Sequence, residues 1–388
     1  MDVNTDFYEI NRFLTTEQIL VRDTIKKFIF ENISPYIEKW CQEAYFPTHL
    51  VKEFGKIGLF GITIPTQYGG SSLDYITYGL AMQEVERGDS GLRSMVSVQN
   101  SLVMYPIYMF GSEEQKTKYL AKLANGELLG CFGLTEPNHG SDPSAMLTHF
   151  ADAGDYIILN GSKMWISNSP MADIAIVWAK NPQDRIQGII VQKDMAGFSA
   201  PYIHNKWSLR ASITGELVFD NVKIPKQNIL PLKDGLGAPL MCLDSARYGI
   251  SWGAIGAAMD CYETALKYSL QRVQFGKPIA SFQLIQKKLA EMLTDITKAQ
   301  LLSWRLGILM NENKASSAQI SMAKRNNVQM AANVAREARQ ILGAMGITGD
   351  YPIMRHMMNI ESVLTYEGTH DIHLLILGKE ITGISAFF

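Results

Sequence analysis

The chain has 388 residues, enough for two or three domains at roughly 150 residues each. Its 36 Lys and Arg residues nearly balance its 38 Asp and Glu residues, and the net charge of −2 excludes broad electrostatic attraction to nucleic acid or anionic lipid. Hydrophobic residues make up 47% and charged residues 19%, which excludes intrinsic disorder and predicts deep burial or extensive contact between subunits.

Targeting, membrane and cysteine signals are weak in this chain. The four cysteines, Cys41, Cys131, Cys242 and Cys261, lie too far apart for a zinc ribbon or a disulfide framework, so we expect reduced, buried thiols. Residues 1–16 resemble neither a signal peptide nor a transit peptide. We therefore expect a cytoplasmic protein, and because no apolar run reaches the ~18 residues of a membrane span, we expect it to be soluble.

The first part of the chain is predicted to be helical. Over residues 15–125 apolar side chains recur at spacings of three and four, as at Tyr119, Leu120 and Leu123, and prolines and glycines interrupt the pattern. The Gly- and Ser-rich segment 65–72 predicts a long connecting loop.

Near residue 128 the pattern changes to short β-rich runs. Residues 156–159 and 163–167 flank Asn160-Gly161, a dipeptide that predicts a two-residue hairpin turn. Further strands are predicted at 174–178, 188–192 and 216–219, each bounded by Pro, Gly, Asn or Asp. We therefore expect a small antiparallel β domain over residues 128–233.

Helical spacing returns after residues 235–237. One apolar stripe runs from Ile285 to Leu309, and a second runs from Ala318 to Leu342, where Gly343 can close the helix in a left-handed conformation. Helices this long and apolar favour a bundle, and bundles often continue across subunits. The pattern thus predicts a helical domain over residues 1–127, the β domain, and a helical bundle over residues 234–388.

Common catalytic motifs are missing from the sequence. It contains no G-x-G-x-x-G after a strand, no G-x-x-x-x-G-K-[ST], no H-E-x-x-H and no G-x-S-x-G. His370 and His373 are three residues apart, but no third ligand lies nearby, so helix capping or packing is a better interpretation than a metal site.

Three segments carry more specific information. Residues 131–142 (CFGLTEPNHGSD) combine a hydroxyl, two glycines and free backbone donors, which suits a loop around a phosphate or a flavin ring, although alone the segment fits a connecting turn equally well. Residues 163–168 (KMWISN) and 366–369 (YEGT) follow later. Together they resemble the acyl-CoA dehydrogenases, in which T-E-P-x-x-G-S-D, W-I-[TS]-N and E-G-T recur in this order around a flavin.

This resemblance covers essentially the whole chain, including residues 272–279 and 340–344. It implies an α+β fold, mainly α, with an N-terminal helical domain, a middle antiparallel β domain and a C-terminal four-helix bundle, assembled as a homotetramer. It also implies FAD as the cofactor and electron-transfer flavoprotein as a partner. A bacterial member is expected in the cytoplasm, and a eukaryotic one in the mitochondrial matrix.

Within that family the chain most resembles the glutaryl-CoA dehydrogenases, at residues 93–99, 168–173, 208–212 and 366–373. Such a resemblance implies oxidation of glutaryl-CoA and decarboxylation to crotonyl-CoA and carbon dioxide. Two alternatives stay open: a dehydrogenase or oxidase for another short-chain acyl-CoA or dicarboxylyl-CoA, and a catalytically silent acyl-CoA-binding or scaffolding protein. The retained Glu367 and flavin loops argue against the second.

Oxidation between the α and β carbons of a thioester needs a base and a hydride acceptor, and because no side chain accepts hydride, a flavin is required. Glu367 matches the family's base, and an apolar pocket would raise its pKa toward working pH. The alternative is a carboxylate that stabilises a helix N-terminus. By resemblance, the thioester oxygen is held by the Glu367 backbone N–H and a ribityl hydroxyl.

Arg93 matches the family's ligand for the distal glutaryl carboxylate, and a guanidinium can bind a carboxylate through two parallel hydrogen bonds. Ser97 could add a hydroxyl if this segment is helical. Glu86 and Tyr366 match positions associated with decarboxylating members, and we expect Glu86 to partner Arg93. The other substrate contacts implied by resemblance are Ser94, Ser141, Leu240, Asp244, Arg247 and Gly368, with a structural ion pair as the alternative for Asp244 and Arg247.

The flavin contacts implied by resemblance fall into three groups. The loop contributes Phe132, Leu134, Thr135 and Ser141; the following strand contributes Trp165, Ile166 and Ser167; the C-terminal region contributes Arg272, Phe275, Gln283, Gln340, Gly343 and Thr369. Several of the last group reach the cofactor of a neighbouring subunit in the family. For Gly343 an ordinary helix C-cap is compatible with that role, and His139 has no assigned role.

Overall fold

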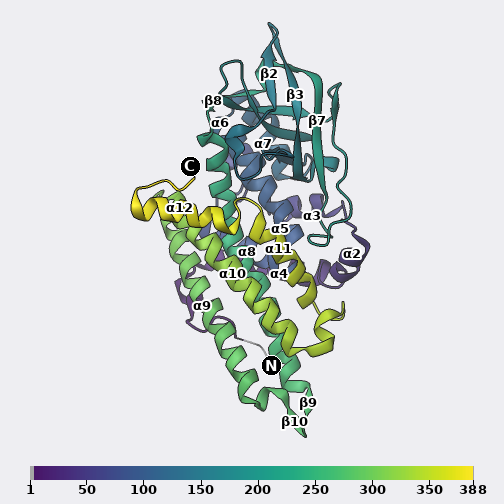
Figure 1. The fold of residues 1–388 in the computed structure, drawn as a ribbon, viewed down its shortest axis with the longest axis vertical. Coiled ribbons are helices and arrows are strands. Elements are labelled where there is room, and N and C mark those ends of the chain that lie inside the picture. The colour runs from purple at the N-terminus through teal and green to yellow at the C-terminus, as the bar shows by residue number, and fades with distance from the viewer. Residues whose placement is uncertain (1–3, 388) are drawn as a thin grey trace.

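In the computed structural model, which describes residues 4–387, helices from both ends of the chain pack together, and the β domain lies at one end of the molecule (Figure 1). This is the predicted mainly helical α+β fold. The N-terminal helices are α1 (Thr16–Asn32), α2 (Ile37–Glu43), α3 (Leu50–Lys56), α4 (Tyr75–Gly88), α5 (Ser90–Ser97), α6 (Tyr105–Phe110) and α7 (Glu113–Ala124). A π-helical segment, Val98–Met104, connects α5 to α6.

Four helices of this domain, α1, α4, α5 and α7, begin at side chains that accept their free N–H groups. Asp74 accepts from Thr77 N–H at 2.7 Å and starts α4, and Asp89 accepts from Gly91 N–H at 2.7 Å and starts α5. Helix α4 is buried along nearly its whole length because it packs against both α1 and α8. It therefore lies in the interior, between the two helical domains.

The middle domain is a twisted sheet whose strands lie in the order β6-β7-β3-β2-β4-β5-β8, with β1 also paired to β4. The strands are β1 (Gly130–Gly133), β2 (His149–Asp152), β3 (Tyr156–Ser167), β4 (Ile174–Lys180), β5 (Ile186–Gln192), β6 (Phe198–Ser199), β7 (Thr214–Pro225) and β8 (Ile229–Asp234). Most pairings are antiparallel, as predicted. Strand β1 is parallel to β4, and β2 meets β4 in one parallel bridge, because these strands are joined by long connections rather than hairpins.

The predicted hairpin turn at Asn160-Gly161 is wrong, because β3 continues through both residues as one strand of 12 residues. The dipeptide forms a bulge opposite β7, where the register shifts between Leu159 and Gly161. Asn160 Oδ1 accepts from Asn221 N–H at 2.8 Å. A Cβ on Gly161, which has φ 135°, would lie 2.6 Å from Thr148 Oγ1. Close approach of a neighbouring segment, rather than chain reversal, requires this glycine.

The C-terminal domain is a bundle of α8 (Gly237–Gln271), α9 (Gln283–Asn311), α10 (Ser317–Ile341) and α11 (Ile353–Thr365), followed by α12 (His370–Thr382). The two predicted apolar stripes lie in α9 and α10, and Gly343 follows α10 with φ 60°. At the far end, a small hairpin of β9 (Val273–Gln274) and β10 (Lys277–Pro278) joins α8 to α9 (Figure 1).

The apolar core has three clusters, of which the first joins the β domain to the helices packed against it. Strand β4 shows how, since Ile176 and Trp178 face the core shared with the N-terminal helices, whereas Ala175 and Val177 face the core within the β domain. The bundle has a third cluster of its own. The four cysteines are buried and free, as predicted. Among residues 4–387 no helix combines the length and the apolarity needed to cross a membrane.

Candidate active site

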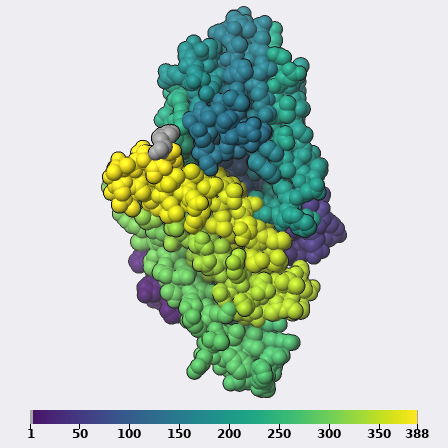
Figure 2. Space-filling model, viewed as in Figure 1, coloured from purple at the N-terminus to yellow at the C-terminus, as the bar shows by residue number. Residues whose placement is uncertain are grey.

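The predicted catalytic residues gather at the turn 366–369, which connects α11 to α12. Around this turn lie α5, α8 and α10, whose charged side chains contact it. On the face seen in Figure 2, the yellow C-terminal segment lies directly against the blue and teal middle domain. The turn therefore lies between α5 of the N-terminal domain and α8 and α10 of the bundle, in the C-terminal segment that borders the middle domain.

Arg93 of α5 is the central charge of the site and is fully buried. Its Nε donates to Glu86 Oε2 at 2.6 Å, and its Nη2 donates to the Tyr366 hydroxyl, whose ring lies 5.6 Å from the guanidinium carbon. Arg93 Nη1 and Glu86 Oε1 are buried without a hydrogen-bond partner among the described residues. The geometry thus contains the expected Glu86–Arg93 pair and leaves one guanidinium nitrogen free for a ligand.

Gly253 of α8 makes room for this ion pair. A Cβ there would lie 2.0 Å from Glu86 Oε2 and 3.2 Å from Arg93 Nε. Any side chain would therefore displace the carboxylate from the guanidinium. On the other side of Arg93, Ser94 and Ser97 are buried in α5, and Ser97 Oγ has no partner within the described chain. The segment is helical, so Ser97 lies one turn from Arg93, as predicted.

Glu367 lies half-buried in a strained turn, with its carboxylate oxygen Oε2 fully buried. Its φ of 53° is left-handed, and its Oε2 has no partner among residues 4–387. Burial raises its pKa above the ordinary range, while Arg93, Lys324 and Arg247 oppose the rise. The helix-terminus alternative does not fit, because Thr369 Oγ1 caps α12 by accepting from Ile372 N–H at 3.2 Å. A buried carboxylate with a raised pKa suits a general base.

Arg247 of α8 fixes the backbone of the same turn. Its Nε donates to the Glu367 carbonyl at 2.8 Å, and its Nη1 lies 3.0 Å from Asp244 Oδ1. The structural ion pair considered for these two residues is therefore present in the free chain. Asp244 also accepts from Ser317, and Leu240 lies half-buried one helical turn before it.

Lys324 of α10 is a site residue that motif reasoning missed. It is 1% exposed, and its Nζ donates to the carbonyls of Tyr366 at 3.1 Å and Gly368 at 2.9 Å. Burial lowers its pKa to about 7, with Glu367 opposing and Arg247 adding to the shift. One signal was available, since Lys324 lies four residues from both Ile320 and Val328, on the apolar stripe of α10.

His373 lies behind the turn, with its ring fully buried and both ring nitrogens unpartnered within the described chain. Burial lowers its pKa to about 3 and keeps the ring neutral. A Cβ on Gly368, which has φ 97°, would lie 2.9 Å from His373 Cε1. This contact agrees with the packing interpretation. No group of three potential metal ligands occurs in the described part of the chain.

The predicted flavin loop and the following strand are brought together. Phe132, Leu134 and Ile166 are buried, Thr135 and Ser167 are half-buried, and Ser141 is exposed. Met164 N–H donates to the Thr135 carbonyl at 2.9 Å, which joins the loop to β3. Trp165 adopts a φ of 62° and exposes 57% of its surface. An exposed indole beside polar loop residues could hold a planar aromatic group.

A buried ion pair that motif reasoning also missed holds this loop in shape. Lys163 Nζ donates to Glu136 Oε1 at 2.9 Å and to the Leu134 carbonyl at 3.1 Å, and Glu136 also accepts from Leu147 N–H and Thr148 N–H. Burial alone would raise the pKa of Glu136, but these donors lower it to about 2. The loop is therefore organised before any ligand binds. His139, for which the sequence suggested no role, donates its backbone N–H to the Glu136 carbonyl.

The remaining predicted flavin residues lie elsewhere. Arg272, Phe275, Gln283, Gln340 and Gly343 are exposed at the end of the bundle that carries the β9–β10 hairpin, opposite the middle domain (Figure 1). Phe275 is 93% exposed. Within one chain these residues do not join the loop and strand. Thr369, by contrast, lies in the turn next to Glu367.

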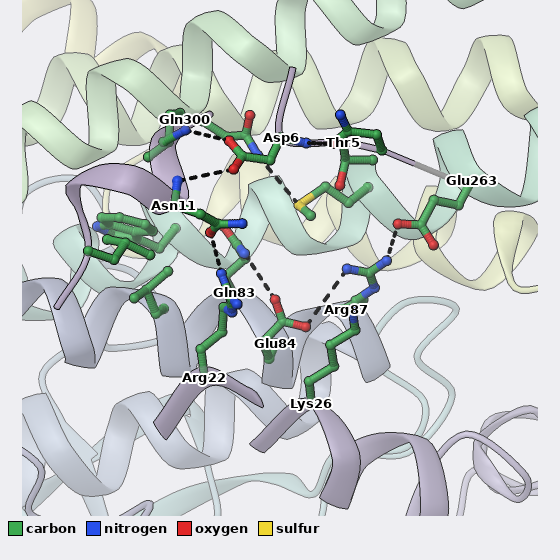
Figure 3. Close-up of a pocket in the computed structure, with 16 residues that line it drawn as sticks. Thr5, Asp6, Asn11, Arg22, Lys26, Gln83, Glu84, Arg87, Glu263 and Gln300 are labelled. Carbon is green, nitrogen blue, oxygen red and sulfur yellow. Dashed lines mark hydrogen bonds and ion pairs between the residues drawn. The ribbon is translucent and has the colours of Figure 1, made fainter. Parts of the chain in front are cut away.

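A separate cavity of about 210 Å³ lies between the N-terminal segment, α1, α4, α8 and α9 and contains none of the predicted site residues (Figure 3). Its walls carry charges of both signs. Arg87 pairs with Glu263, and Arg22 donates to Asn11. The Arg22–Asn11 contact joins α1 to the N-terminal segment, so the cavity fits a role in anchoring that segment.

Comparison with known proteins found matches to one family along nearly the whole chain. Acyl-CoA dehydrogenase domain profiles match in order: N-terminal over residues 15–127, middle over 131–222 and C-terminal over 233–382. An acyl-CoA dehydrogenase of Bacillus subtilis (strain 168) is 38% identical over 375 residues, covering 95% of this chain and 99% of that protein. A glutaryl-CoA dehydrogenase structure from Mycobacterium smegmatis is 48% identical, covers 99% of each chain and has a TM-score of 0.97. A structure of a glutaryl-CoA dehydrogenase from the same organism in complex with FADH2 is 47% identical, with the same coverage and TM-score.

Proposed function

The chain belongs to the acyl-CoA dehydrogenase family, and we propose that it oxidises glutaryl-CoA and decarboxylates the product to crotonyl-CoA and carbon dioxide. In this proposal electron-transfer flavoprotein receives the electrons. The likeness to glutaryl-CoA dehydrogenase supports the choice of substrate, and the site's geometry supports it independently.

One observation carries the proposal. Two buried charged groups with unpartnered atoms lie in the same site, the carboxylate of Glu367 and the guanidinium of Arg93. Arg93 is close enough that its positive charge opposes the rise in the pKa of Glu367 that burial causes. A substrate with an acidic α carbon and a distal carboxylate would satisfy both groups together, whereas a plain acyl chain would leave Arg93 Nη1 unpaired at a cost of about 1–3 kcal/mol. Glutaryl-CoA has both features.

Each residue has a distinct part in this scheme. Glu367 removes the α proton, because its carboxylate is buried and free of competing donors. Arg93 and Ser97 bind the distal carboxylate. Glu86 shares the Arg93 charge and so weakens its hold on that carboxylate when carbon dioxide must leave. Arg247 holds the Glu367 carbonyl, which orients the turn.

The chain fits FAD as its cofactor. The exposed indole of Trp165 and the polar atoms of Thr135, Ser141 and Ser167 provide a surface and hydrogen-bonding groups for a flavin. When bound, FAD supplies the acceptor for the β hydride. The exposed residues at the far end of the bundle would complete the cofactor site only in another copy of the chain, which supports an oligomer; the tetramer rests on the family resemblance.

Anaerobic titration of the holoenzyme with glutaryl-CoA and with butyryl-CoA, followed by product analysis, tests the proposal. We expect glutaryl-CoA to bleach the flavin and to yield crotonyl-CoA and carbon dioxide. Bleaching by butyryl-CoA alone would mean a dehydrogenase for unsubstituted short chains, and glutaconyl-CoA without carbon dioxide would mean a non-decarboxylating enzyme. Rapid reoxidation by oxygen would indicate an oxidase. A purified protein without flavin absorbance would support a silent binding protein.

A further inference from the structure

The turn that carries Glu367 is held in an unfavourable backbone conformation. Glu367 and Gly368 both have positive φ, of 53° and 97°, and for the glutamate this costs on the order of 1–2 kcal/mol. Such a conformation persists only when surrounding groups impose it. The turn must therefore be held by side chains from outside it.

Two buried basic side chains hold three consecutive carbonyls of the turn. Lys324 donates to the carbonyls of Tyr366 and Gly368, on either side of Glu367, and Arg247 donates to the carbonyl of Glu367 itself. The Glu367 N–H makes no hydrogen bond to any other described residue. With all three carbonyls bound, this N–H is left free in a fixed direction.

Apart from its bonds to the turn, no contact within the described chain explains why the Lys324 side chain is buried. It is 1% exposed, and no carboxylate among residues 4–387 lies within ion-pair distance of its Nζ. Burying an ammonium without a carboxylate partner is expensive unless hydrogen bonds satisfy it. The two carbonyl bonds to the turn are the hydrogen bonds that its Nζ makes within the described chain.

We propose that Lys324 is the positioning residue for Glu367: by holding the carbonyls on both sides, it fixes the left-handed turn from which the carboxylate and the free N–H reach the substrate. This inference rests on the proposed role of Glu367 as the base but not on the identity of the acyl group. It adds an electrostatic effect, since the Lys324 charge favours the ionised form of Glu367.

Lys324→Met and Lys324→Gln test this proposal in the holoenzyme. We expect Lys324→Met to retain FAD and to bind acyl-CoA within a few-fold of the native enzyme, but to lose flavin reduction rate by on the order of 100-fold, as a small misplacement of a catalytic group does. Lys324→Gln keeps an amide donor and should recover part of the rate. If Lys324→Met fails to fold, Lys324→Gln tests the proposal in its place.

Two further readouts separate positioning from a general loss of stability. The pH at which flavin reduction reaches half its plateau should move upward in both variants, because Glu367 loses a neighbouring positive charge. The titratable and charged groups that interact with Glu367 are Arg93 of α5, Arg247 of α8, Tyr78 of α4, Tyr366 of the turn and Lys324 of α10 itself. Only Lys324 changes in the variants. Amide hydrogen exchange over residues 366–369 should also accelerate, and this measurement needs no substrate.

Lys206→Met is the matched control. Lys206 also binds backbone carbonyls, those of Leu209 at 3.0 Å and Ser212 at 2.8 Å, but in a loop of the middle domain. It should lose stability without changing the pH profile or the exchange of the turn. Unchanged exchange in Lys324→Met, or an unchanged pH profile with native rates, would overturn the proposal. The kinetics are read on whichever acyl-CoA the native enzyme oxidises, so failure of glutaryl-CoA as a substrate is a separate result.

Discussion

Arg93 is expected to have two separable roles, one in folding and one in substrate selection. It is fully buried and paired with Glu86 at 2.6 Å, so Arg93→Met leaves Glu86 as a buried, uncompensated carboxylate. Breaking a buried pair from one side costs about 3–5 kcal/mol of folding free energy. In the double variant Arg93→Met/Glu86→Gln no charge remains, and most of that loss should be restored.

In the double variant, the preference for glutaryl-CoA over butyryl-CoA should stay lost even though the folding stability is restored. A hydrogen bond to a charged group is worth about 1.5–3 kcal/mol, so losing the free Nη1 donor should lower kcat/KM for glutaryl-CoA by on the order of 10- to 100-fold, at about 1.4 kcal/mol per tenfold. Butyryl-CoA has no distal carboxylate and should be affected far less. Both the single and the double variant should show this difference, because neither carries the guanidinium.

The assay combines denaturant unfolding with the rate of anaerobic flavin reduction by the two substrates. Arg355→Met is the matched control, since Arg355 is also a buried arginine, paired with Asp89 at 3.0 Å and Glu38 at 2.7 Å. Arg355→Met should lower the free energy of unfolding without changing the ratio of the flavin reduction rates with the two substrates. Equal losses for glutaryl-CoA and butyryl-CoA in Arg93→Met would refute the carboxylate assignment. A double variant as unstable as the single one would refute the electrostatic reasoning.

Three other outcomes follow from the same structure. Glu367→Gln should bind glutaryl-CoA but fail to bleach the flavin, and rapid bleaching in stopped-flow absorbance would mean that another group is the base. Glu86→Ala should raise the ratio of glutaconyl-CoA to crotonyl-CoA measured by chromatography, and an unchanged ratio would exclude Glu86 from decarboxylation. Glu136 has a folded pKa of about 2 against an ordinary 4.5, so its contribution to stability is complete above pH 4.5 and is lost as the pH falls toward 2. Glu136→Gln should therefore flatten the dependence of unfolding free energy on pH in that window, and an unchanged dependence would contradict the assigned pair with Lys163.

Local sequence patterns and motifs were sufficient to predict many of the helices and strands of this protein. Period-three and period-four spacing located the bundle helices α9 and α10, and Gly343 follows the end of α10 in a left-handed conformation. The Arg93–Ser97 spacing indicated one helical face, and α5 presents both side chains in its buried interior. These features depend on residues close in the chain, so a sequence contains the information that specifies them.

Other features depended on segments far apart in sequence. Asn160-Gly161 has the composition of a turn, yet pairing with β7 and the close approach of Thr148 make it a bulge in a continuous strand. The parallel pairing of β1 with β4 could not be predicted from local signals either, because it joins segments about 44 residues apart in the chain.

The sequence by itself determined the order of helical, β and helical regions and the family, and it supplied the residues that we propose act on the substrate. Tertiary structure alone decided how those residues are held. Lys324 lies more than 40 positions from the two carbonyls that it binds, and Glu86 contacts Arg93 only because Gly253 of a third helix leaves room. Periodicity records which face of an element is buried, but the partner that a buried polar group meets depends on how the elements pack.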